Sequence, residues 1–157
     1  MEPHKARPWP YARAAFKARR SAEKTALHPR RRHERQRLDL RDACVRHAEG
    51  RYKTALCTSP YICRFNERMQ INGAEIPDDM LAELTERVKP IAEGMADHPS
   101  QFELVTAIAM LYFLEEKCDI VVLEVGLGGA LDSTNAIDCP ECAVITTIGL
   151  EHTEYLG

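Results

Sequence analysis

Three segments of the chain end in side chains that can bind a divalent cation. Ser59 follows the apolar run "TALCT", Glu124 closes "DIVVLE", and His152 follows "ITTIGLE". A hydroxyl, a carboxylate and an imidazole at one place would suit Mg²⁺ beside a nucleotide, because the cation takes few protein ligands and keeps positions for phosphate oxygens and water. The glycines after Glu124 add a tight turn, which is weak evidence of phosphate binding when taken alone.

Each of these residues also has a plainer interpretation. Glu124 can be a strand-end acid that reaches solvent, and the glycines after it can serve only as a turn. Ser59 can cap a turn or helix, and a lone histidine such as His152 is more often a surface residue. The magnesium–nucleotide interpretation therefore depends on the joint position of the three residues.

Strands and helices are predicted to alternate from Tyr52 onward. Short apolar runs indicate strands in "YKTALCTSP", "CDIVVLEV" and "CAVITTIGL". Helical spacing of apolar residues predicts helices in "IPDDMLAELTERVKPIAEGM" and "SQFELVTAIAMLYFLEEK". The intervening "YICRFNERMQING" is expected to be irregular or extended, ending in a turn at Asn72-Gly73.

This order of elements predicts an α/β fold, a parallel sheet with flanking helices. Continuous apolar strands are typical of parallel sheets that are covered on both faces. Ligands of such sheets gather beyond the carboxyl ends of the strands, which is where Ser59, Glu124 and His152 fall.

The chain divides into two parts of opposite charge, although its net charge is only −3. Residues 1–53 contain 16 Lys and Arg against 6 acids, a net of +10, whereas residues 54–157 contain 5 against 18, a net of −13. No apolar run is long enough to span a membrane, and no secretory leader is recognisable. The 6 cysteines have no disulfide-framework spacing, so we expect reduced thiols in the cytoplasm; the lone Cys139-Pro-Glu-Cys142 pair lacks a second ligand pair for zinc.

The region from Tyr52 to Gly157 closely resembles folylpolyglutamate synthase and dihydrofolate synthase of the Mur ligase superfamily. Four segments carry the resemblance in the order and spacing of the family: "TSPYICRFNERMQING", "QFELVTAIAMLYF", "LEVGLGGALDSTN" and "ITTIGLEHTEYLG". The family uses ATP to activate a folate or dihydropteroate carboxylate as an acyl phosphate, which the amine of L-glutamate attacks. The resemblance implies an ATP- and Mg²⁺-dependent ligase with a P-loop-type domain, a monomer at full length, with no nucleic-acid or membrane partner.

The family pattern also implies roles for individual residues. It makes Ser59, Glu124 and His152 the magnesium ligands, with the ion bridging phosphate oxygens during phosphoryl transfer. A mobile loop that helps to close the folate site is implied at Arg64, Phe65, Asn66, Glu67 and Arg68. The pterin side of that site is implied at Gln101, Phe102, Glu103, Leu131, Asp132 and Ser133. For Phe102, a place in the helix core is an equally good account.

Some features of the family are altered or missing. Ala130 stands where Arg is common, Tyr61 where His is frequent, and Glu151 where Asp is frequent. The phosphate loop, which reads approximately "HVAGTNGKGST" in the family, does not precede the first strand, and the modified lysine and C-terminal domain do not follow Gly157. Since the backbone N–H groups and the lysine of that loop hold the phosphates, the chain alone is expected to be inactive.

Residues 1–51 form a basic segment that is expected to be irregular. Such Arg-dense sequence can be a disordered tail, a nucleic-acid-binding arm or an organelle presequence. A further hypothesis is a frame error: permitted codons for residues 28–39, read one base later, encode I-H-V-A-G-T-N-G-K-G-S, which is the missing loop. We thus expect an out-of-frame remnant in residues 1–51 and a partial ATP-binding domain in residues 52–157. A nucleic-acid-binding protein and an inert gene fragment are the alternatives.

Overall fold

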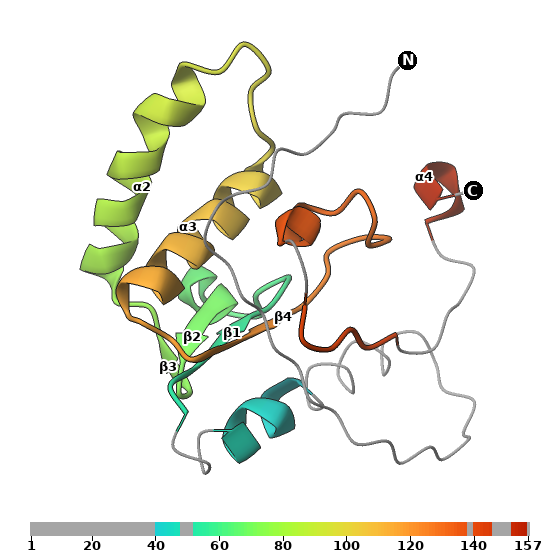
Figure 1. The fold of residues 1–157 in the computed structure, drawn as a ribbon. Coiled ribbons are helices and arrows are strands. Elements are labelled where there is room, and N and C mark those ends of the chain that lie inside the picture. The colour runs from blue at the N-terminus through green and yellow to red at the C-terminus, as the bar shows by residue number, and fades with distance from the viewer. Residues whose placement is uncertain (1–39, 48–51, 138–139, 146–151, 157) are drawn as a thin grey trace.

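The computed structural model describes residues 40–47, 52–137, 140–145 and 152–156 (Figure 1). Residues 40–47 are helical. The further elements, in chain order, are β1 (Thr54–Cys57), the 3₁₀ helix η1 (Phe65–Arg68), β2 (Met69–Ile71), β3 (Ala74–Glu75), α2 (Asp78–Glu93), α3 (Gln101–Glu115), β4 (Ile120–Leu123), the 3₁₀ helix η2 (Ser133–Ala136) and α4 (Thr153–Leu156).

The four described strands form one mixed sheet in the order β3-β2-β1-β4. β1 and β4 are parallel, with Cys57 opposite Leu123, which confirms the predicted parallel pairing of these two apolar segments. β2 and β3 add antiparallel strands where an irregular or extended stretch was predicted. The predicted turn explains this hairpin, because Asn72 and Gly73 both have positive φ, +49° and +82°, as its tight connection requires.

Both predicted helices are confirmed, and they cover one face of the sheet (Figure 1). α2 begins after Pro77 with two acids in its first turn, where they oppose the positive end of the helix dipole. α3 begins at a capping box in which Ser100 and Glu103 satisfy each other's backbone N–H groups. The main hydrophobic core lies between these two helices and the sheet. Its buried residues are Ala55, Cys57, Met69, Ile71, Ile76, Leu84, Val88, Val105, Ile108, Ala109, Tyr112, Phe113 and Val121.

The opposite face of the sheet carries a smaller cluster beneath the helical segment 40–47 (Figure 1). It consists of Leu40, Leu56, Ile120 and Val122, with Cys44 packed against it. Side chains of a strand alternate between faces, so β1 and β4 supply residues to both clusters.

The third predicted strand was placed in residues 142–150. Residues 142–145 are not in a strand, and residues 146–150 lie outside the described part of the chain. The predicted remnant in residues 1–51 also lies outside it except for residues 40–47. Within the described residues, no helix has both the length and the apolar character needed to cross a lipid bilayer.

Candidate functional site

The adjacent carboxyl ends of β1 and β4 bring Ser59 and Glu124 together. The parallel ladder continues past the strands, because the N–H of Glu124 donates to the carbonyl of Cys57 at 2.9 Å. The side chain of Glu124 then turns toward β1, and its Oε2 accepts the backbone N–H of Ser59 at 2.6 Å. Glu124 is only 6% exposed, so its carboxylate is a buried group rather than the solvated strand-end acid of the plainer interpretation.

Buried charge at these strand ends affects a neighbouring thiol. The pKa of Cys57 is raised to about 12, chiefly by burial; the Arg68 guanidinium acts to lower it, and the negative charges of Glu124 and Asp132 act to raise it. Three charged side chains from separate segments thus act on one point near the end of β1. The strand ends therefore gather charge in a poorly solvated region.

The segment implied as the mobile folate loop is tied down in this structure. The carboxylate of Glu67 accepts three successive backbone N–H groups, from Ile62, Cys63 and Arg64, at 2.8–2.9 Å. These bonds explain why the chain turns back into η1, since ionised carboxylates are strong acceptors.

Two further side chains anchor the same segment to the start of α2. Asn66 donates to the carbonyl of Ile76 at 2.8 Å and to Asp78 at 2.7 Å. Arg64 also donates to Asp78, at 3.1 Å. The segment is thus positioned by its own polar side chains, and its role in closing a folate site stays a prediction.

The loop after β4 folds around the carboxylate of Asp132. One oxygen accepts the N–H of Leu127 at 2.8 Å, and the other accepts the N–H of Thr134 at 2.9 Å. Gly128 and Gly129 have positive φ, +72° and +124°, in the tight turn between these contacts. Asp132 therefore has a structural role in this loop, whatever it does toward a ligand.

This loop rests on the first turns of α3. Gly126 lies so close to Phe102 that an added Cβ would stand 2.6 Å from the ring, and Ser133 Oγ is 2.9 Å from Thr106 Oγ1. The two parts of the implied pterin side thus meet in space. Phe102 is half-buried and packs against the loop, while Gln101, Glu103 and Leu131 are exposed.

His152 lies on a different part of the chain, immediately before α4. It is exposed and has a φ of +54°. Within the described ranges, no group of three or more His, Cys, Asp or Glu side chains is arranged to hold a metal ion. Two of the three predicted ligands, Ser59 and Glu124, are adjacent, and both have oxygen atoms of the kind that Mg²⁺ prefers. The role of His152 stays a prediction.

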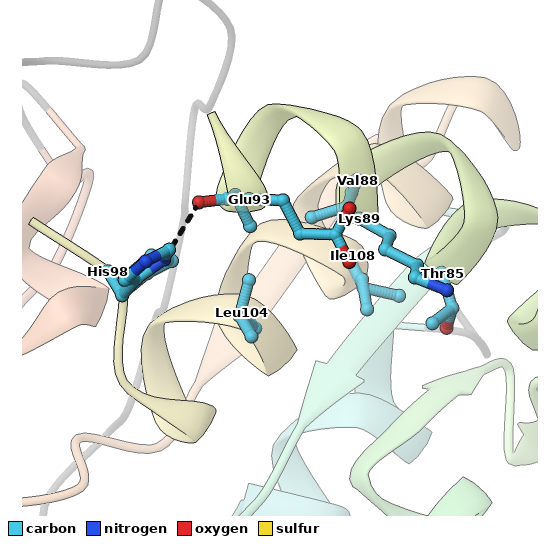
Figure 2. Close-up of a pocket in the computed structure, with 9 residues that line it drawn as sticks. Thr85, Val88, Lys89, Glu93, His98, Leu104 and Ile108 are labelled. Carbon is cyan, nitrogen blue, oxygen red and sulfur yellow. Dashed lines mark hydrogen bonds between the residues drawn. The ribbon is translucent and has the colours of Figure 1, made fainter. Parts of the chain in front are cut away.

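A shallow apolar groove lies elsewhere, between α2 and α3 (Figure 2). Figure 2 shows Val88, Leu104 and Ile108 inside it and Lys89, Glu93 and His98 at its margins. His98 Nδ1 lies 3.3 Å from the carbonyl of Ala92, which ties the connection between the helices to the end of α2. Sequence reasoning did not predict this groove, because its residues have the ordinary spacing of two packed amphipathic helices.

Comparison with known proteins supports the resemblance drawn from the sequence. No family model matches the chain. The dihydrofolate synthase/folylpolyglutamate synthase of Bacillus subtilis is 44% identical over 114 residues, covering 69% of this chain and 26% of the relative. The enzyme of that name from Escherichia coli is 38% identical over 107 residues, covering 68% of this chain and 24% of the relative.

Solved structures agree. Escherichia coli FolC in complex with ADP matches with a TM-score of 0.70 and 35% identity, covering 75% of this chain and 28% of that one. An FPGS–AMPPCP complex matches with a TM-score of 0.63 and 39% identity, covering 73% and 29%. A bifunctional synthase with Mn, AMPPNP and L-glutamate bound matches with a TM-score of 0.57 and 30% identity, covering 60% and 23%. The chain spans about a quarter of the length of the curated relatives it matches.

Proposed function

We propose, from the relationship of this chain to folylpolyglutamate and dihydrofolate synthases, that it carries part of the site of an ATP-dependent acid–amino-acid ligase. The substrates would be ATP, a folate or dihydropteroate carboxylate, and L-glutamate. The observation that carries the proposal is the buried carboxylate of Glu124 beside Ser59 at the carboxyl ends of two parallel strands. Ligands of α/β sheets bind at such ends.

Ser59 and Glu124 would hold the divalent cation, which offsets phosphate charge during phosphoryl transfer when it is bound. The N–H of Ser59 fixes the orientation of the Glu124 carboxylate at 2.6 Å. Burial of Glu124 keeps competing water away and strengthens its attraction for a cation. Among solved relatives, one contains ADP and another contains Mn, AMPPNP and L-glutamate, which supports the same ligand classes here.

Asp132, Ser133 and Phe102 would form the pterin side of the carboxylate substrate's site. Their mutual positions are set by the bonds of Asp132 within the loop and by the contacts of Gly126 and Ser133 with α3. An aromatic face and nearby acceptors are what a flat ring with N–H donors requires. We place the full-length protein in the cytoplasm as a monomer, on the same resemblance.

A chimera tests the function. Residues 52–157 would replace the matching segment of the Bacillus subtilis relative, and glutamylated folate would be measured by mass spectrometry. We expect product, and we expect Glu124→Ala to lower it by at least about 100-fold, since it removes a cation ligand on the transferring phosphate. The matched control is Glu116→Ala. It removes an acid at the C-terminal end of α3, where Glu116 pairs with Lys53 at 2.6 Å.

A folded chimera that forms no product would contradict the proposal. The chain as given is expected to form none, because no phosphate loop is encoded in its reading frame. Nucleotide sequencing across codons 1–55 tests the frame hypothesis separately: a single-base shift must restore the loop, or the hypothesis fails.

A further inference from the structure

The hydroxyl of Thr106, in the second turn of α3, joins this helix to the loop that follows β4. Its Oγ1 donates to the carbonyl of Phe102 at 2.8 Å and lies 2.9 Å from the Oγ of Ser133. A hydroxyl has a single proton, and a carbonyl oxygen can only accept a hydrogen bond. Both contacts are therefore hydrogen bonds only when Thr106 donates to Phe102 and Ser133 donates to Thr106.

Burial protects this arrangement from competing water. Thr106 is only 5% exposed, whereas Ser133, at the start of η2, is half-buried and still reached by solvent. A hydrogen bond in such a poorly solvated place is stronger than one at the surface. The proton of Ser133 is thus held against α3, and its lone pairs are left for a ligand.

Ser133 is the acceptor with free capacity in this part of the loop. Both oxygens of the neighbouring Asp132 are occupied, because one accepts the N–H of Leu127 and the other accepts the N–H and the hydroxyl of Thr134. Within the part of the chain that the structure describes, the Ser133 hydroxyl has no partner other than Thr106. A ligand group that bonds to Ser133 must therefore donate a proton.

Phe102 supplies an aromatic surface beside this acceptor. Its backbone carbonyl takes the proton of Thr106, and its ring lies against Gly126 of the same loop. The ring and the Ser133 hydroxyl thus both adjoin the contact between α3 and the loop. A flat ligand that stacks on the ring can donate a hydrogen bond to the hydroxyl from its edge.

We propose that Thr106 is a positioning residue that makes the substrate site select an amino-substituted ring. This inference rests on the proposed function, in which Phe102 and Ser133 belong to the pterin side. With its own proton held by Thr106, Ser133 accepts a hydrogen bond from the 2-amino group of a pteridine. A 2-oxo group in that place meets the lone pairs of Ser133 with no proton between them, so a 2-oxo ring binds more weakly. Thr106 itself touches no ligand and acts through Ser133.

Two probes that differ in this one group test the assignment: pterin has the 2-amino group, and lumazine has a 2-oxo group in its place. Each would be titrated into the whole chain, and the Kd would be measured from the NMR signals of the chain. The main variant is Thr106→Val, which keeps the branched shape of the side chain but removes its hydroxyl. Thr85→Val on α2 is the matched control, because the Thr85 hydroxyl likewise donates to the carbonyl four residues earlier, that of Leu81, at 2.7 Å.

We expect the parent chain to bind pterin about 10-fold more tightly than lumazine, which is the value of one hydrogen bond. Thr106→Val should reduce this ratio to about 2-fold or less, since Ser133 is then free to donate to the 2-oxo group. Thr106→Ser, which restores the hydroxyl, and Thr85→Val should both keep the parent ratio. If Thr106→Val does not fold, Ser133→Ala takes its place and should reduce the ratio equally.

A ratio that the main variant leaves unchanged would overturn the proposal, as would a parent chain that binds both probes equally or binds neither. An equal reduction by Thr85→Val would show a general loss of helix packing and would overturn it too. The proposed function fails separately, because product formation by the chimera tests it. The chimera can form product while Thr106→Val keeps the parent ratio, or form none while that variant loses it.

Discussion

The two faces of the sheet differ greatly in how much apolar surface they bury. α2 and α3 cover one face with a cluster of 13 buried residues, including Leu84 at 0% exposure. Among the described residues, the opposite face has a cluster of 4 buried residues beneath the helical segment 40–47. Because burial of apolar area is the main source of stability, the helical face should account for most of the free energy of unfolding.

This difference also separates the proposed ligands. The pterin side, Phe102 and the loop around Asp132, rests on α3 and thus on the well-packed face. Thr58 and Glu124 directly follow β1 and β4 and continue the alternation of Leu56 and Val122, so we expect them on the face of the smaller cluster. The region where charge would be transferred is therefore the less stabilised of the two.

The largest difference between the two faces is expected in the free energy of unfolding of two matched Leu→Ala variants. Leu84→Ala should lower the free energy of unfolding by about 3 kcal/mol, since it leaves a cavity in the densely packed face. Leu40→Ala, in the smaller cluster, should cost less, about 1–2 kcal/mol, because the described part of that cluster has only three other buried residues, Leu56, Ile120 and Val122. Urea unfolding followed by circular dichroism measures both; an equal or larger effect of Leu40→Ala would refute the difference between the faces.

A second test addresses the attachment of the loop to α3. Gly126→Ala places a Cβ 2.6 Å from the Phe102 ring and 3.0 Å from Asp132 Oδ2. One of these groups must move, so we expect a loss of about 2 kcal/mol, as is usual for overpacking. Gly94→Ala is the control, since its Cβ would lie 3.4 Å from the nearest atom, the carbonyl of Pro90. Equal melting temperatures for the two variants would show that the loop is not packed on α3.

The sequence predicts a helix or strand correctly where its apolar pattern extends over several residues. β1, α2, α3 and β4 have apolar runs or helical spacing long enough to read, and the Asn72-Gly73 turn has a strong local signal. The β2–β3 hairpin was missed because its strands have only 3 and 2 residues. Residues 142–145 read as strand but form none, since an apolar run becomes a strand only when a neighbour completes its hydrogen bonds.

The candidate site was predicted in part. The spacing of strand ends was enough to bring Ser59 and Glu124 together, because the carboxyl ends of parallel strands meet. The bonds of Glu67 and the contact of Arg68 with the Tyr61 ring could not be predicted, because they depend on how one short segment turns back on itself. No periodic pattern signals such contacts.

Smaller effects are expected in the rates at which thiols on the two faces react with a labelling reagent. Cys63 is exposed and should react first with a maleimide at pH 8. Burial raises the pKa of Cys44 to about 11 and that of Cys118 to about 11, so about one thiol in a thousand is ionised at that pH. Slow labelling of either must then follow opening of its face, and Cys44, beside the smaller cluster, should react several-fold faster than Cys118.

The same thiols give a dependence of stability on pH with a defined sign. Burial raises their pKa in the folded chain above the ordinary thiol value of 9.0, so folding favours the protonated form. This contribution is complete below pH 9 and is lost as the pH rises toward 11. Cys118→Ser and Cys44→Ser should each flatten the fall in melting temperature between pH 9 and 11 by about a degree or two, because the pKa of both thiols is raised to about 11. A profile that Cys44→Ser leaves unchanged would show that the helical segment 40–47 does not keep its thiol away from water.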